Sequence, residues 1–388
     1  MNGVHAGCTV CLLKPGIARA RALASGRRRQ RALCSFYTGG EVACFRARPN
    51  ETADSDPADV VQARPADLGL VSAAAVGADF ACAIVSSTSL VRCWRGAYED
   101  PSPSGWRVPE DLGKVRALAA GQRHACAITE RRGLRCWGGL RDTGSAIEVP
   151  EDIARGDRNS WDPIVKAVAC ASGSTCVLVS PFWEGRATLK CFGDPSYSAY
   201  WPTADEWDTP LAIWGLETGY CVQWAVAGLA CTGNVSVPQA QAALTGAKAA
   251  AMCKIDTSAA AAAVMGDGGR VWAWGLNIWS GYVPEGLGPA ATNTPAAMAS
   301  SSEHVCAIQV ARGGLESEPS FWGSPPQVSN VRCWGDRWDA NPPAAPAGLG
   351  AAMSLAQGFT KSHTCAILRP CRENTRFNPA TYSCEIPR

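Results

Sequence analysis

Two short segments, each with one cysteine, decide the fold of this chain. They read Gly121-Gln-Arg-His-Ala-Cys126-Ala-Ile128 and Leu134-Arg-Cys136-Trp137-Gly138, and a turn that contains Gly133 separates them. Polar and apolar residues alternate in the second segment, which is the period-2 pattern of a β-strand. We expect Gly133 to supply a positive φ in the turn. The stretch therefore predicts a β-hairpin with one cysteine on each strand.

The same pair of segments recurs along the chain. The paired cysteines are Cys34/Cys44, Cys82/Cys93, Cys126/Cys136, Cys176/Cys191, Cys221/Cys231 and Cys306/Cys333. A further unit at residues 259–275 keeps the frame but carries Ala261 and Ala273 at the cysteine positions. Successive units begin about 40 to 50 residues apart, which is typical of propeller blades. We therefore expect an all-β, seven-bladed β-propeller, with eight blades as the alternative.

The spacing within each pair predicts a disulfide inside each hairpin. Most pairs are separated by about 10 residues, enough for two short strands and a turn. Directly opposed residues of antiparallel strands have Cβ atoms about 4.5–5.5 Å apart. A disulfide needs about 3.5–4.5 Å, so a modest local adjustment suffices. The wider spacings of Cys176/Cys191 and Cys306/Cys333 place insertions at those two turns.

The two ends of the chain resemble two halves of one hairpin. The segment around Cys11 resembles a second strand without a first, and residues 363–367 resemble a first strand without a second. We expect these ends to pair, to close the ring, and to be locked by Cys11–Cys365. Residues 1–370 then form the propeller. Residues 371–388 form a short tail with a Cys371–Cys384 bond, or begin a cysteine-rich module.

Three cysteines remain outside these pairs, namely Cys8, Cys170 and Cys253. The total of 19 cysteines is odd, so at least one has no partner within the chain. The spacing of Cys8 and Cys11 is that of a zinc knuckle, but no matching second half exists. We expect no bound metal.

An alanine run tests the repeat against local propensity. Residues 258–264 read Ser-Ala-Ala-Ala-Ala-Ala-Val, which by itself favours a helix because alanine is the best helix former. The repeat places a strand there. We expect the strand, because packing between blades outweighs a few tenths of a kcal/mol per residue.

Composition limits the class of protein. The chain has 388 residues, 47% of them hydrophobic, and a formal net charge of +2. These values exclude wholesale disorder and give no strong field for nucleic acid. No apolar run is long enough for a transmembrane helix, and no ordinary signal peptide is visible at the start. The paired cysteines nevertheless favour an oxidising compartment. Either a fragment of a longer ectodomain or a wrongly assigned start would reconcile the two observations.

The candidate catalytic residues fall on repeat positions. His124, His304 and His363 each lie two residues before a cysteine of the repeat. One histidine per blade favours a structural role, with the imidazole bonded to a neighbouring backbone group. We assemble no catalytic set and expect neither enzymatic activity nor a cofactor.

The tryptophans divide into two groups. Trp94, Trp137, Trp274 and Trp334 follow the second cysteine position, where one aromatic per blade would pack between blades. Others lie in links and insertions, where exposed aromatics are typical recognition anchors. The candidate ligand contacts are Trp183, Trp201, Trp207, Trp322 and Trp338.

The repeat Gly-x-x-His-x-Cys-Ala-Ile followed by Gly-x-Val-x-Cys-Trp-Gly resembles the propeller repeats of the regulator-of-chromosome-condensation (RCC1) superfamily. It is most similar to the cysteine-containing repeats in Crinkly-type receptor kinase ectodomains, and the propeller-type β-lactamase inhibitor protein shares that fold. The resemblance covers about residues 24–368. It implies recognition on a propeller face, without catalysis. The Gly-Gln-Leu-Gly links of the nuclear branch are missing here.

These observations favour an extracellular or cell-surface binding module for a protein or glycan ligand, of the kind found in receptor ectodomains. We expect no nucleic-acid partner. Two alternatives remain: an intracellular exchange factor or scaffold of the same superfamily with reduced cysteines, and a propeller-type inhibitor of a secreted hydrolase. Cysteines found as free thiols would favour the first alternative. Hydrolase inhibition would favour the second.

Overall fold

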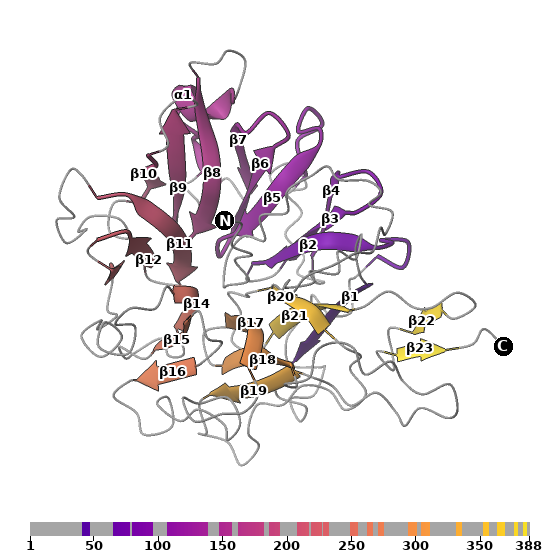
Figure 1. Cartoon of the computed structure of the whole chain (residues 1–388). Helices are drawn as coiled ribbons and strands as arrows, with labels where there is room; N and C mark the ends of the chain where they lie inside the picture. Colours follow the sequence, from indigo (N-terminus) through magenta and orange to yellow (C-terminus); the bar gives the residue numbers. More distant parts are fainter. Residues whose placement is uncertain are drawn as a thin grey trace, which may run out of the picture.

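The protein is an all-β molecule whose short antiparallel sheets are arranged radially (Figure 1). The computed structural model describes residues 41–46, 65–77, 80–95, 107–138, 147–156, 162–181, 186–194, 208–216, 219–226, 228–232, 249–254, 262–266, 271–274, 294–300, 304–310, 331–335, 352–356, 363–368, 376–378 and 383–385. Within these described residues, one helical turn, α1 (Glu151–Ala154), interrupts the strands. No helix in these segments is long and apolar enough to cross a membrane.

The described strands form seven sheets of three strands and one two-stranded hairpin. The three-stranded sheets are β2 (Val71–Val76), β3 (Phe80–Val85) and β4 (Val91–Arg95); β5 (Val115–Ala120), β6 (His124–Thr129) and β7 (Leu134–Gly138); β8 (Pro163–Cys170), β9 (Ser174–Pro181) and β10 (Thr188–Gly193); β11 (Pro210–Leu216), β12 (Gly219–Trp224) and β13 (Leu229–Cys231); β14 (Ala249–Lys254), β15 (Ala262–Gly266) and β16 (Val271–Trp274); β17 (Thr294–Ser300), β18 (His304–Val310) and β19 (Val331–Gly335); and β20 (Ala352–Ala356), β21 (His363–Leu368) and β1 (Glu41–Arg46). The hairpin is β22 (Arg376–Asn378) with β23 (Ser383–Glu385).

In each three-stranded sheet, in the order given above, we call the first strand inner, the second middle and the third outer. The hairpins expected from the repeat are the middle and outer strands of these sheets. The inner strand of each sheet was not anticipated, because it carries no cysteine–tryptophan signature. Each inner strand shows a register shift near its start, as between Val115 and Ala117 of β5. Such a shift strengthens local twist. The inner strands contact one another in chain order from β2 to β20, and β20 contacts β2.

Five of the expected disulfides are present, all at one register position. In each case a cysteine of the middle strand lies opposite a cysteine of the outer strand, with Cα atoms 4.0–4.1 Å apart. The bonds are Cys82–Cys93, Cys126–Cys136, Cys176–Cys191, Cys221–Cys231 and Cys306–Cys333. The bonds therefore lie within sheets and do not join one sheet to the next.

Strand pairing at the chain ends corrects one expectation. β1 pairs with β21, and this register places Cys44 opposite Cys365. The sequence instead suggested that the strand of Cys44 pairs with a strand at Cys34, and the strand of Cys365 with one at Cys11. The reason is that β1 has the alternating pattern of any outer strand, and a local pattern does not reveal a distant partner. The strand pairing is corrected, whereas the bonds Cys34–Cys44 and Cys11–Cys365 are not tested. Cys11, Cys34 and Cys371 lie outside the described residues.

The alanine-containing unit is a strand, as the repeat predicted. β15 begins at Ala262, within the run that local propensity would make helical. Its register corrects the expected alignment by two residues, because Ala263 lies opposite Ala273. Ala263 therefore occupies the position of the middle-strand cysteine.

Apolar side chains fill the spaces between neighbouring sheets. Trp137 of β7 packs with Phe80 and Ile84 of the preceding sheet. Trp94 of β4 packs with Val42 of β1 in the same way. Trp334 is also buried. The packing role between sheets is therefore confirmed for Trp94 and Trp137, and the burial of Trp334 agrees with it. For Trp274, whose side chain lies outside the described part of the structure, it stays a prediction.

The turn between β6 and β7 corrects the role given to Gly133. The positive φ of 62° belongs to Arg132. A Cβ at Gly133 would lie 2.6 Å from the carbonyl oxygen of Ala154, at the end of α1. A glycine is therefore needed for the close approach of two backbones.

Candidate functional site: a buried polar network between sheets

The network is built on the tight turn that joins the inner and middle strands. The amide of Gly121 donates to the carbonyl of His124 at 2.8 Å, and Gly77 and Phe80 make the same bond at 2.8 Å. A Cβ at Gly121 would lie 2.3 Å from His124 Cε1 and 2.4 Å from the carbonyl oxygen of Ala171. The Gly-x-x-His motif therefore lets the imidazole fold over its own turn, against the next sheet.

His124 joins two sheets through a side-chain hydrogen bond. Its Nε2 lies 2.9 Å from Oγ1 of Thr175 on β9, and the imidazole is fully buried. Burial lowers the pKa of His124 from 6.5 to about 4, so the ring is neutral at physiological pH. The sequence suggested a backbone group as the partner; the backbone of Ser174 does act on the imidazole and partly offsets the effect of burial on its pKa, and the Thr175 hydroxyl is a second partner on the same sheet.

The Thr175 hydroxyl also lies near two sulfur atoms. It is 3.5 Å from Cys126 Sγ, which belongs to a disulfide and has no hydrogen to donate. It donates to Cys170 Sγ at 3.9 Å. Cys170 is a buried free thiol, and burial raises its pKa to about 12. Since the thiolate is the reactive form, Cys170 is unreactive in the folded protein near neutral pH.

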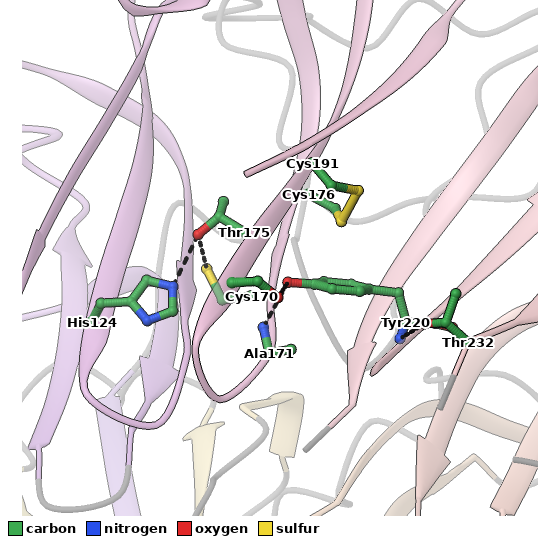
Figure 2. Close-up of a disulfide and its surroundings, with 9 residues drawn as sticks. His124, Cys170, Ala171, Thr175, Cys176, Cys191, Tyr220 and Thr232 are labelled. Atoms are coloured by element: carbon green, nitrogen blue, oxygen red, sulfur yellow. Dashed lines mark hydrogen bonds between the residues drawn. A yellow bond between two sulfur atoms is a disulfide. The ribbon is translucent and has the colours of Figure 1, made fainter. Parts of the chain in front are cut away.

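Tyr220 extends the network to a third sheet (Figure 2). Its hydroxyl accepts from the amide of Ala171 at 3.1 Å and lies 2.8 Å from Ser174 Oγ. Burial raises the pKa of Tyr220 well above 10. The amide of Tyr220 donates to Thr232 Oγ1 at 2.9 Å. Polar contacts therefore run continuously from β6, through the β8–β9 turn, to β12.

The network does not form a metal centre in this oxidised state. His124, Cys126 and Cys170 have ligand atoms within 4.8 Å of one another. The sulfur of Cys126 is bonded to Cys136, however, and offers no thiolate. Two donors remain, fewer than the three or four protein ligands of zinc sites. The arrangement fastens adjacent sheets through three contacts, from His124 to Thr175 and from Tyr220 to Ala171 and Ser174.

The acidic residues of the links pair with the outer strands. Arg92 of β4 lies 3.1 Å from Asp67, and Arg135 of β7 lies 3.1 Å from Asp111, all of them exposed. Lys190 of β10 pairs with Asp152 of α1. The hydrogen bond from Arg92 lowers the pKa of Asp67. Such exposed pairs contribute little stability, but their repetition identifies these carboxylates as surface partners of the outer strands.

The structure locates only part of the predicted site. The five candidate ligand contacts all lie outside the described residues: Trp183, Trp201, Trp207, Trp322 and Trp338. Sequence reasoning missed Thr175 and Tyr220, which each precede a cysteine of the repeat. Alanine holds this position in other units, as at Ala81 and Ala125. A polar residue in a repeat column that is apolar in most units was the available signal.

The fold is that of an RCC1-like β-propeller. Yeast RCC1 (Prp20), in a structure bound to Kap60, is 12% identical, with 93% of this chain and 97% of that chain covered and a TM-score of 0.55. Prp20p of Saccharomyces cerevisiae, in a second structure, is 11% identical, with coverage of 86% and 92% and a TM-score of 0.55. At these identities the likeness concerns the fold alone.

A third solved structure is the Crinkly WD40 ectodomain of the Arabidopsis thaliana receptor kinase ACR4. It is 16% identical, with 77% of this chain and 94% of that chain covered and a TM-score of 0.48. This TM-score is too low to add to the fold assignment. No protein-family model matches the chain, and no curated protein does.

Proposed function

We propose that this protein is a disulfide-stabilised, seven-bladed propeller that works outside the cell as a non-catalytic binding module for a protein partner. The observation that carries the proposal is the set of five disulfides at one register position of the repeat. Disulfides persist in oxidising compartments and are rare in the cytosol and nucleus. In a reducing, intracellular compartment these five bonds would not persist.

Two further observations support a closed ring of seven blades. The described residues form seven three-stranded sheets, and the last of them combines β20 and β21 with β1 from the other end of the chain. The inner strand of that sheet, β20, contacts β2 of the first sheet. Radial repetition leaves only short, protected sheet edges, and the rigid faces of a closed ring suit binding by surface loops.

Proteins with the same fold support protein binding as the role. One neighbouring structure shows yeast RCC1 bound to Kap60, and another concerns the binding of Prp20p to Gsp1p and histones. For the present chain we propose the link and insertion tryptophans as contacts, because aromatic side chains dominate binding energy at interfaces. None of the comparisons supports a glycan ligand.

The first experiment determines the redox state. Protein from its native source is denatured without reductant in the presence of a thiol-alkylating reagent, so that buried thiols are also labelled, and the peptides are then identified by mass spectrometry. We expect Cys82, Cys93, Cys126 and Cys136 to be unlabelled. Labelling of these four cysteines in protein taken from its native source would contradict the extracellular proposal and favour an intracellular exchange factor or scaffold.

The second experiment addresses the partner. The oxidised protein, immobilised, is exposed to secreted proteins from its own source, and the captured partner is titrated against variants. We expect Trp201→Ala or Trp322→Ala to weaken binding at least tenfold, as at interface hot spots. Val226→Ser, at a side chain that is 87% exposed, is the matched control. Binding that no tryptophan variant weakens would refute the proposed contacts. Inhibition of a captured hydrolase would identify an inhibitor.

A further inference from the structure

Cys44 and Cys365 occupy the disulfide position of the sheet that joins the two ends of the chain. β1 and β21 are antiparallel, and their register makes Cys44 the Cα partner of Cys365. In the five sheets with a described disulfide, the bonded cysteines hold the same place, on the outer and the middle strand.

The neighbouring pairs repeat as well. Ile367 lies opposite Val42, two residues from the cysteine pair, and Thr364 lies opposite the aromatic Phe45. In the sheet of β3 and β4, Ile84 lies opposite Val91, and Ala81 lies opposite the aromatic Trp94. Because side chains alternate between the two faces of a strand, equal spacing from these markers places both cysteine pairs on the equivalent face.

We propose that Cys44 and Cys365 form a disulfide that closes the propeller covalently. The two thiols lose two protons and two electrons to a disulfide donor, which is itself reduced to two thiols, and one S–S bond forms. This bond differs from the other five in the length of chain that it encloses. They close hairpins with separations of 10 to 27 residues, whereas this one would enclose a loop of roughly 320 residues.

The inference rests on the proposed closed ring and adds a covalent lock to it. Without the bond, the last sheet depends on the hydrogen bonds of one terminal strand, and chain ends are where fraying concentrates. With the bond, a single cut in any link between β1 and β21 leaves the two fragments joined. Closure of the ring then no longer depends only on the noncovalent pairing of β1 with β21.

The experiment uses the full chain, oxidised with a mixture of oxidised and reduced glutathione, and with a protease site inserted between Thr232 and Ala249. None of the five described disulfides spans this point. After cleavage and denaturation without reductant, we expect one band, which a reductant splits into two. Peptide mapping should then recover Cys44 linked to Cys365.

The double variant Cys44→Ala/Cys365→Ala should separate into two fragments without reductant. The matched variant Cys82→Ala/Cys93→Ala, which removes a hairpin disulfide, should remain one band. Recovery of Cys44 linked to Cys34, recovery of Cys365 linked to Cys11, or recovery of both Cys44 and Cys365 as thiols would overturn the inference.

Hydrogen exchange of residues 41–46 separates this failure from failure of the proposed ring. If the bond is absent but these amides are protected, the covalent lock is wrong and the closed ring stands. If the bond is absent and these amides exchange freely, the pairing of β1 with β21 fails as well, and with it the ring.

Discussion

The sheet of β5–β7 and the sheet of β14–β16 have the same register and differ in what they carry there. In the first, Cys126 lies opposite Cys136 and is bonded to it. In the second, Ala263 lies opposite Ala273. The aromatic neighbour is kept, because Trp137 and Trp274 lie opposite Ala125 and Ala262. The strands therefore align without sulfur. The disulfide is therefore not required for this register, and we expect it to add stability to a hairpin that is already defined.

The largest loss of stability should follow from removing the tryptophan that both sheets carry after the second cysteine position. Trp137→Ala should cost about 3–5 kcal/mol, because it empties the space between β5–β7 and the preceding sheet. Chemical denaturation of the oxidised protein measures this value. A smaller loss than that from removing the Cys126–Cys136 bond would mean that the disulfide, and not the packing, defines the hairpin.

The next largest effect should be a loss of stability on acidification that arises in the sheet of β5–β7 and not in that of β14–β16. The repeat position of His124 in the first sheet is held by Ala261 in the second, which cannot bind a proton. The pKa of His124 is lowered from 6.5 to about 4 in the folded protein, so the unfolded chain binds the proton more readily. Its contribution is fully present above about pH 6.5. As pH falls towards 4, about 3 kcal/mol is lost.

The control for this pH dependence is His124→Phe, which copies Phe80 of the neighbouring sheet, where the same turn holds an aromatic ring. Denaturation curves between pH 7 and pH 4 should show a weaker loss of stability in this variant than in the wild type. Parallel losses in the two proteins would contradict the assignment of a buried neutral imidazole.

Removing the Cys126–Cys136 disulfide should make the sheet of β5–β7 resemble the sheet of β14–β16, which has alanines at that position. The double variant Cys126→Ala/Cys136→Ala should lose about 2–3 kcal/mol, the chain-entropy value for a loop of this length. Its circular dichroism should be unchanged, because the register does not depend on the bond. Loss of the β-sheet spectrum in native buffer would show that this hairpin needs its disulfide to form.

The converse change should have the smallest effect. Ala263→Cys/Ala273→Cys places cysteines at an established register position, so a bond should form during oxidative folding. The gain should be about 1–2 kcal/mol, since engineered disulfides often deliver less than the chain-entropy value. Peptide mapping checks the bond and denaturation checks the gain. Two free thiols at these positions would show that the register of β15 and β16 is different.

The repeat predicted the parts of the fold that carry its own signature. The middle and outer strands, five disulfides and the strand at Ala262 followed from the spacing of cysteine, tryptophan and glycine. The inner strands did not, because small apolar residues such as those of Val71–Val76 fit a strand, a helix or a link equally well. The partner of β1 did not either, because long-range pairing leaves no local pattern.

The buried network shows the same limit at the level of side chains. His124 was visible as a repeated residue, and its position two residues before Cys126 indicated a structural role. Its partner Thr175 comes from the next sheet. That contact depends on how two sheets approach each other, which the spacing within one repeat does not determine. The candidate binding tryptophans stay a prediction, since they lie outside the described residues.

The most direct test of the central claim is a complete thiol and disulfide map of the native protein, prepared without reductant at a pH that prevents exchange. We expect Cys126 bonded to Cys136 and Cys176 bonded to Cys191, with Cys170 between the two pairs in sequence as an unmodified thiol. Bonds that join cysteines of different hairpins, such as Cys136 with Cys176, would contradict this pairing.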